Sequence, residues 1–118
     1  MEPFIYTMVH GADWAEATTA GAYAGSADDR RDGFLHFSTA AQLRASAAKH
    51  RKGQAGLVLV KVESARLGEA LVWEPAKGGS RPGLFPHLYG TLPIPLVTSA
   101  DPLPLGPDGL HIFPTEIP

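Results

Sequence analysis

The sequence predicts an α+β domain in which two N-terminal helices pack against a mostly antiparallel sheet. The chain has 118 residues, which suits a single domain over residues 1–118 and is short for two. Hydrophobic residues make up 44% of it, so it can build a core. Ten of its 11 prolines lie at or after Pro75, which excludes an all-helical bundle and indicates two differently built halves.

The first half of the chain alternates predicted strands and helices. Residues 4–9 are rich in β-prone side chains and predict the first strand, and residues 12–20 predict a short helix. Residues 22–33 follow no apolar periodicity, so we expect a loop there. Residues 34–37 predict a short strand that places His36 on the opposite face from its two neighbours.

Thr39 marks the start of the helix that the sequence supports best. With Gln42 it forms a capping-box pattern, and the alanine-rich run that follows predicts a helix as far as Lys52. The basic run at residues 49–52 falls at the end of this helix, where cations complement the helix dipole. A solvated helix end is therefore the favoured interpretation of this run, and a grip on phosphate is the alternative.

The second half predicts strands that prolines keep short. Residues 56–62 are apolar enough for a central strand, and residues 71–74 predict another. Residues 75–86 are glycine-rich, and we expect a loop. Beyond residue 90, prolines recur so often that the extended pieces, including residues 97–103, are expected at a sheet edge or in ordered loops.

Composition excludes several classes of function. The net charge of −2 makes a general nucleic-acid binder unlike this chain, because such domains are basic. The absence of cysteine excludes disulfides, thiolate metal sites and cysteine nucleophiles. No apolar stretch has the ~20 residues that span a bilayer, and no signal peptide is evident, so we expect a cytoplasmic protein without a membrane partner.

His36, Ser38 and Thr39 form the first candidate site. They precede a predicted helix, whose free N–H groups can hold an anion. His36 could donate a hydrogen bond to a sugar hydroxyl or a phosphate while the two hydroxyls frame the anion. The alternative is a core histidine satisfied by backbone, with hydroxyls that only cap the helix.

Trp73 and Glu74, at a predicted strand end, form the second candidate site. Glu74 could act as a general acid or base, or stabilise an oxocarbenium-like centre. The alternative is that Glu74 pairs with Arg81 or Lys77 on the surface while Trp73 fills the core.

His87 and Tyr89 form the third candidate site, because period-two spacing places them on one face. An imidazole beside an aromatic ring suits stacking on a planar ligand and hydrogen bonding at its edge. The alternative is a buried Tyr89 with an exposed His87. A zinc site from His36, His87 and Glu74 is conceivable, but the five histidines lack metal-ligand spacing, so we expect no metal.

Several motifs carry a family resemblance that covers nearly the whole chain. They are DGFLHFST at residues 32–39, LVLV at 57–60, LVWE at 71–74, LFPHLYG at 84–90 and PLGPDG at 104–109. Together they resemble the family Domain of Unknown Function 952 (DUF952). Residues 80–83 lengthen one loop relative to the family pattern, which puts any role of Arg81 in doubt.

The resemblance implies a fold similar to that of the ADP-ribosyltransferases, which consume NAD. In that superfamily a histidine on an early strand holds the nicotinamide ribose. The resemblance makes His36 the matching catalytic residue, with Ser38 or Thr39 beside it in the cofactor-binding set.

The same resemblance completes a candidate pocket. Trp73 or Tyr89 would stack on nicotinamide, Glu74 is the candidate catalytic glutamate, and His87 joins the binding set. We therefore expect a pocket for a nucleotide-like small molecule, with NAD as the candidate cofactor and ADP-ribosyl transfer or hydrolysis as the candidate reaction. The alternative is a noncatalytic small-molecule-binding or sensor module on the same fold.

The proline distribution predicts how such a pocket is built. The proline-poor half supplies His36, and the proline-rich half supplies stiff segments that would wall a cleft opposite it. Prolines lower the entropy cost of holding such segments in one shape. Protection of edge strands is the other explanation for the prolines.

Overall fold

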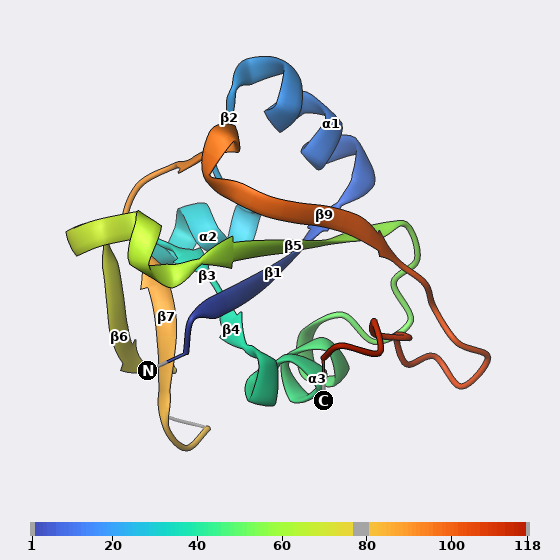
Figure 1. Ribbon diagram of the computed structural model, residues 1–118. Coiled ribbons are helices and arrows are strands. Elements are labelled where there is room, and N and C mark those ends of the chain that lie inside the picture. Colours follow the sequence, from blue (N-terminus) through green and yellow to red (C-terminus); the bar gives the residue numbers. More distant parts are fainter. Residues whose placement is uncertain (1, 77–80, 118) are drawn as a thin grey trace.

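A computed structural model describes residues 2–76 and 81–117 (Figure 1). The order of elements is β1 (Phe4–His10), α1 (Gly11–Ala20), β2 (Ala22–Tyr23), α2 (Ala27–Asp32), β3 (Leu35–His36), β4 (Ser38–Thr39), α3 (Ala40–His50), β5 (Leu57–Glu63), η1 (Ser64–Ala70), β6 (Leu71–Pro75), β7 (Leu84–Leu88), β8 (Leu92–Pro93), η2 (Ile94–Leu96) and β9 (Val97–Leu103). The two η elements are 3-10 helices. The α+β class is confirmed.

The strands form two main sheets, and every strand pair within the described ranges is antiparallel. The larger sheet has the order β4-β1-β5-β9 and the smaller has β3-β7-β6, while β2 pairs with β8. In Figure 1, β6 and β7 stand upright while β5 and β9 cross the molecule, so the two sheets meet at a steep angle. The central place of β5 and the edge place of β9 confirm two predictions.

Helix α2 corrects the predicted loop over residues 22–33, and it makes three α-helices in the described chain instead of two. The side chain of Ser26 accepts from the backbone of Asp29, and the Asp29 carboxylate accepts from the backbone of Ser26. A six-residue helix is too short to show apolar periodicity. The Ser-x-x-Asp capping pattern was the signal that could have found it.

Strand β7 corrects the predicted loop over residues 75–86, since residues 84–86 pair with β6. Pro86 of β7 faces Trp73 across the ladder, and its carbonyl accepts from the backbone N–H of Phe37 at 3.0 Å. A proline removes one donor from a strand but keeps the acceptor, so a middle strand can still bond through its carbonyl there. Residues 77–80 of the expected loop lie outside the described residues.

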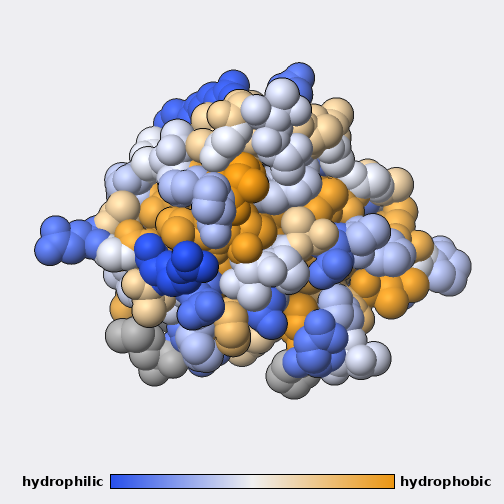
Figure 2. Space-filling view, turned by 45° about the horizontal axis from the view of Figure 1, so that its top comes forward, coloured by the Kyte–Doolittle hydropathy of each residue, from blue (hydrophilic) through white to orange (hydrophobic). Residues whose placement is uncertain are grey.

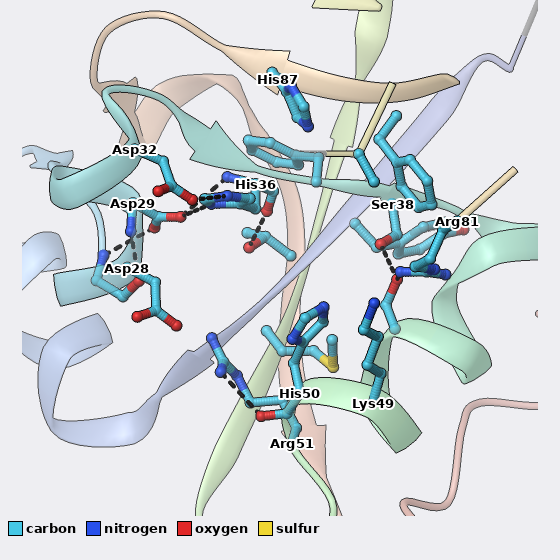
Figure 3. Close-up of a pocket in the computed structure, with 18 of the residues that line it drawn as sticks. Asp28, Asp29, Asp32, His36, Ser38, Lys49, His50, Arg51, Arg81 and His87 are labelled. Atoms are coloured by element: carbon cyan, nitrogen blue, oxygen red, sulfur yellow. Dashed lines mark hydrogen bonds and ion pairs between the residues drawn. The ribbon is translucent and has the colours of Figure 1, made fainter. Parts of the chain in front are cut away.

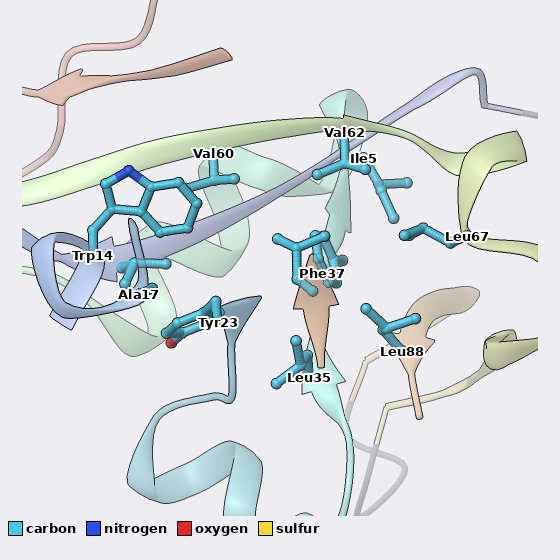
Figure 4. Close-up of a cluster of buried hydrophobic side chains, with 12 residues drawn as sticks. Ile5, Trp14, Ala17, Tyr23, Leu35, Phe37, Val60, Val62, Leu67 and Leu88 are labelled. Atoms are coloured by element: carbon cyan, nitrogen blue, oxygen red, sulfur yellow. The ribbon is translucent and has the colours of Figure 1, made fainter. Parts of the chain in front are cut away.

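The core has two clusters on opposite faces of the larger sheet. Because successive strand residues point to opposite faces, Val60 and Val62 join one cluster while Leu57 and Leu59 join the other. The first cluster packs Trp14 of α1 and side chains of the smaller sheet against β1 and β5 (Figure 4). The second is closed by α3. In the first turn of α3, the side chain of Gln42 donates to the carbonyl of Leu84 on β7 at 2.7 Å.

The surface mixes polar and apolar groups. Figure 2 shows one face on which hydrophobic residues reach the surface near the centre and are bordered by hydrophilic ones. Exposed apolar side chains are ordinary on soluble domains. No helix in the described part of the chain is long and apolar enough to cross a membrane.

Candidate functional site

A cavity of about 410 Å³ lies between α2, β3, the C-terminal end of α3 and β7 (Figure 3). Its volume falls within the range of small-molecule sites, about 300–1,000 Å³. Arg81, Phe85 and His87 of the proline-rich half line it together with residues of the first half. Residues of both halves therefore line this cavity, although His87 lies next to His36 on the same sheet and not opposite it.

The ring of His36 is held between two aspartates of α2. Its Nδ1 lies 2.5 Å from Oδ1 of Asp29, and its Nε2 lies 2.9 Å from Oδ2 of Asp32. The hydroxyl of Thr7 donates to the His36 carbonyl at 3.0 Å. Because a carboxylate only accepts hydrogen bonds, both ring nitrogens must carry protons to satisfy both aspartates. The clamp therefore favours the imidazolium.

The charges around His36 act in the same direction. Partial burial disfavours the imidazolium, but the hydrogen bonds and charges of Asp29 and Asp32 outweigh it and raise the pKa of His36 above 6.5. Burial also disfavours the Asp29 carboxylate, but hydrogen bonds from His36 and the Ser26 backbone lower the pKa of that carboxyl below 3.8. Both N–H groups of His36 are thus engaged by protein before any ligand arrives.

His87 of β7 pairs with His36 of β3 across the smaller sheet. Directly opposed residues in an antiparallel pair share a face, and the two imidazole centroids lie 5.7 Å apart in an edge-on arrangement. The ring of Phe34 stacks on His87 at 4.0 Å and 22°, and it tilts against His36 at 4.6 Å. The side chain of His87 is 4% exposed, and it lines the cavity.

Glu74 connects His87 to Tyr89. One oxygen of Glu74, Oε1, lies 2.9 Å from Nδ1 of His87 and accepts from the Tyr89 hydroxyl at 2.6 Å. The bond from Tyr89 and then that from His87 lower the pKa of Glu74. Burial lowers the pKa of His87 against the opposing effect of Glu74. A neutral His87 that donates from Nδ1 to this carboxylate carries its lone pair on Nε2.

Arg81 forms a polar chain with two serines on another side of the cavity. Its Nη1 donates to Oγ of Ser46 at 2.9 Å, and that oxygen lies 2.7 Å from Oγ of Ser38. The guanidinium also lies 4.3 Å from the centroid of the Phe85 ring. The two hydroxyls have two protons and share one hydrogen bond, so the serine pair retains one O–H for another acceptor.

The basic run at the end of α3 lines the same cavity through Lys49, His50 and Arg51. Burial and then the charges of Lys49 and Arg51 lower the pKa of His50. Nε of Arg51 is buried and has no hydrogen-bond partner among the described residues. The run ends the helix as predicted, and its side chains also border the cavity, which the favoured interpretation of a solvated helix end did not include.

Three of the seven sequence-predicted site residues line the cavity: His36, Ser38 and His87. The other four are not among the described residues that line it. Thr39 caps α3, and Trp73 packs partly buried against the first core cluster. Glu74 and Tyr89 reach the cavity only through His87.

Some of the alternatives weighed from sequence are now decided. Tyr89 is 45% exposed and His87 3% exposed, the reverse of the alternative for that pair. Glu74 pairs with His87 and Tyr89, and Lys77, its other candidate partner, lies outside the described residues.

Sequence reasoning missed Asp29, Asp32 and Arg81 as site residues. The two aspartates lie in the segment that was predicted as a loop, and only the capping pattern of Ser26 and Asp29 indicates a helix there. Arg81 lies in the loop that departs from the family pattern, and no local signal indicated its contact with Ser46. The described residues contain no group of three or more side chains that could hold a metal ion.

Comparisons with known proteins give a family and a fold. A family model described as "Protein of unknown function (DUF952)" matches residues 8–100. The crystal structure of protein CC0527 from Caulobacter crescentus is similar with a TM-score of 0.86 and 43% identity, over 92% of this chain and 93% of that chain. Its solution NMR structure gives a TM-score of 0.81 and 44% identity, over 92% and 90% of the two chains. A search of the curated proteins finds no match.

Proposed function

Because this chain belongs to the DUF952 family of proteins of unknown function, we propose its function from the cavity: it binds a nucleotide-like ligand, with NAD as the candidate, and supports ADP-ribosyl transfer or hydrolysis. The ADP-ribosyltransferase-like fold that the sequence resemblance implies is part of this proposal.

The observation that carries the proposal is the separation of charge within one cavity. Asp28, Asp29 and Asp32 line one side, where they outnumber the cations Arg31 and His36. The cations Lys49, Arg51 and Arg81 line the other sides (Figure 3). NAD has the same polarity, since its nicotinamide ring is cationic and its pyrophosphate is anionic. Guanidinium and ammonium groups are the usual protein partners of phosphate oxygens.

The hydrogen-bond donors on the basic side support this orientation of NAD in the cavity. Arg51 has a buried Nε without a partner among the described residues, and Arg81 and the serine pair offer further donors. An unpaired buried donor carries a desolvation cost that an anionic ligand would offset. On the acidic side, Asp28 pairs with Arg31 at 3.2 Å, so a cationic ring would compete with an exposed ion pair.

A noncatalytic binding module is the second candidate. The observation that favours it is the position of the two residues that sequence marked as catalytic. Both ring nitrogens of His36 are bonded to aspartates, and Glu74 contacts the cavity only through His87. Neither side chain is free to act directly on a ligand in this arrangement.

Binding is tested by calorimetry and ligand-observed NMR with NAD, ADP-ribose and nicotinamide. We expect NAD and ADP-ribose to bind, and their affinity to fall as salt is raised, because phosphate contacts are screened. Absence of binding by all three at millimolar ligand would contradict the proposal. Release of nicotinamide from bound NAD then separates an enzyme from a binding module.

A matched pair of arginine variants locates the phosphate contact. Arg81→Gln is expected to weaken ADP-ribose binding about tenfold or more, because a charge-assisted hydrogen bond contributes about 1.5–3 kcal/mol. Arg66→Gln removes the same charge at an exposed position in η1, outside the cavity lining. Equal weakening by both variants would indicate only a general charge effect.

A further inference from the structure

The side chains of Glu74, His87 and Tyr89 form a chain whose chemistry differs from that of the His36 clamp. Glu74 uses one oxygen for both of its partners, at 2.9 Å to His87 and 2.6 Å to Tyr89. The bond to Glu74 fixes the tautomer of a neutral His87, since the carboxylate can only accept. The nitrogen left over, Nε2, has a lone pair and no hydrogen-bond partner in the described part of the chain.

We propose that His87 is the proton acceptor of this cavity: its Nε2 takes a proton from the water that attacks the anomeric carbon of bound NAD, while Glu74 and Tyr89 position the ring. The proposal rests on the proposed function, because it requires NAD in the cavity.

The step balances without a further reactant. The water oxygen forms a bond to C1′ of the nicotinamide ribose as the bond from C1′ to nicotinamide breaks. The electron pair of the broken bond goes to the ring nitrogen, so nicotinamide leaves as a neutral molecule. The proton from water goes to Nε2 of His87 and then to solvent. The products are ADP-ribose, nicotinamide and one proton.

The two histidines of the cavity divide the roles because their surroundings differ. His36 has a carboxylate on each ring nitrogen, so it has no lone pair to accept a proton. His87 has one carboxylate partner, and its ring is covered by Phe34 at 4.0 Å. Titratable groups in one cavity whose environments drive their pKa values apart are the usual sign of separate acid and base roles.

The environment of His87 suits a base that works near neutral pH. Burial comes first in lowering its pKa, and the charge of His36 on β3 adds to this. Glu74 on β6 and Asp32 on α2 act in the opposite direction, because they favour the imidazolium. As His87 gains a proton, its bond to the Glu74 carboxylate becomes an ion pair and stabilises the product of proton transfer.

The structure assigns Glu74 a different role from the one that sequence suggested. As a positioning residue it touches Nδ1 of His87 and not the ligand. Tyr89 neutralises part of its charge from the exposed side. Removing either group should therefore alter how His87 titrates, which a purely structural role would not do.

The test measures nicotinamide release from NAD and NAD affinity in parallel. We expect His87→Gln to lower kcat about 100-fold or more, the lower bound for loss of a general base, with Kd changed less than about threefold. Its matched control is His10→Gln, an exposed histidine outside the cavity lining. Tyr89→Phe and Glu74→Gln provide variants of less buried positions should His87→Gln fail to fold.

The pH profile tests the positioning role. Wild-type kcat should fall in acid as His87 becomes protonated. Glu74→Gln should move this acid limb to lower pH, because the carboxylate that stabilises the imidazolium is gone. Its matched control, Glu69→Gln, alters an exposed carboxyl in η1 and should leave the limb in place. Imidazole ¹⁵N NMR should show the Nδ1–H tautomer of His87 at neutral pH.

Each outcome decides between the two proposals. If NAD does not bind, both fail. If NAD binds but the wild type releases no nicotinamide, or if His87→Gln releases it at the wild-type rate, the proton-acceptor role is overturned and the binding proposal stands. An Nε2–H tautomer of His87 would overturn it as well.

Discussion

One carboxylate oxygen of Asp29 holds both the ring and the backbone of His36. Oδ1 lies 2.5 Å from Nδ1 of that ring and 3.1 Å from its backbone nitrogen. The other oxygen of Asp29 accepts from the backbone of Ser26 and caps α2. A single side chain therefore joins the start of a helix to the strand beside the cavity, and its pairing with His36 makes stability depend on pH.

We expect the stabilising effect of His36 to be greatest in mild acid. Its pKa is raised in the folded state, so its contribution is complete below about 6.5 and is lost as the pH rises through the folded value. The destabilisation caused by His36→Gln, measured by urea unfolding, should be larger at pH 5.5 than at pH 9. Comparison with the variant is needed because the lowered pKa of His87 acts in the opposite direction.

Asp29 adds a second pH dependence of the folding stability, at acid pH. Its pKa is lowered on folding, so its contribution is complete above about pH 3.8 and is lost as the pH falls through the folded value.

The control for the His36 prediction is His10→Gln, which should not show the larger destabilisation at pH 5.5. A destabilisation by His36→Gln that grows with pH would contradict the assignment of a charged, doubly bonded ring.

Gly25 is expected to tolerate no side chain. Its φ is +104°, and an added Cβ would lie 2.7 Å from Cδ2 of Leu35 and 2.8 Å from Cβ of Asp29. Gly25→Ala should destabilise the fold by about 3 kcal/mol, from left-handed strain and overpacking together. It should also disturb the clamp on His36, because Asp29 would have to move.

Gly21→Ala is the matched control for this position. Gly21 has a φ of +92°, but a Cβ there meets nothing within 4 Å. Strain alone predicts a cost of about 1 kcal/mol. Chemical denaturation of both variants separates the cost of left-handed strain from the cost of overpacking. Equal losses of unfolding free energy would show that the contacts around Gly25 do not matter.

Thr39→Ala is expected to lower stability without altering the ligand site. Thr39 accepts from the backbone of Gln42 and caps α3, and it is not among the described residues that line the cavity. The loss of a cap of this kind costs about 1 kcal/mol. Thermal unfolding should show the loss while ADP-ribose affinity stays unchanged. If the variant is fully folded and still binds ADP-ribose more weakly, Thr39 does belong to the ligand site.

Ser46→Ala is expected to weaken phosphate binding by about threefold to tenfold. The variant removes the oxygen that accepts from the Arg81 guanidinium at 2.9 Å. Water can replace this oxygen as a partner, so we expect the loss to be smaller than the contribution of a hydrogen bond to a charged group, about 1.5–3 kcal/mol. Calorimetry with ADP-ribose measures the change. Ser99→Ala in β9, which does not line this cavity, is the control. Binding as tight as in the wild type would show that the orientation of Arg81 is not set by Ser46.

Local patterns explain the successes of sequence-based prediction here. The capping box of Thr39 and Gln42 joins residues three apart, and the helix it predicts is present as α3. The apolar alternation of residues 57–62 likewise depends only on the period of a strand, and β5 lies in the middle of the larger sheet. The one comparable signal that was overlooked, Ser26 with Asp29, began a helix too short for periodicity.

The site depends on register between segments far apart in the chain. His36 and His87 meet because β3 pairs with β7, and Glu74 reaches His87 because β6 lies on the other side of β7. A slip of one residue would turn each of these side chains to the opposite face. Residue types alone marked His36, Glu74 and His87 as candidates, but they did not indicate which of them would touch one another.

The sequence by itself determined the α+β class, the central strand, the capped helix and the concentration of prolines in one half, because each follows from neighbours within a few residues. Only the tertiary structure decided that His36 is clamped by two aspartates, that Glu74 is hydrogen-bonded to His87, and that the basic run of α3 borders a cavity. The physical reason is that protonation and hydrogen bonding depend on distances of about 3 Å between atoms, and packing sets those distances across the fold.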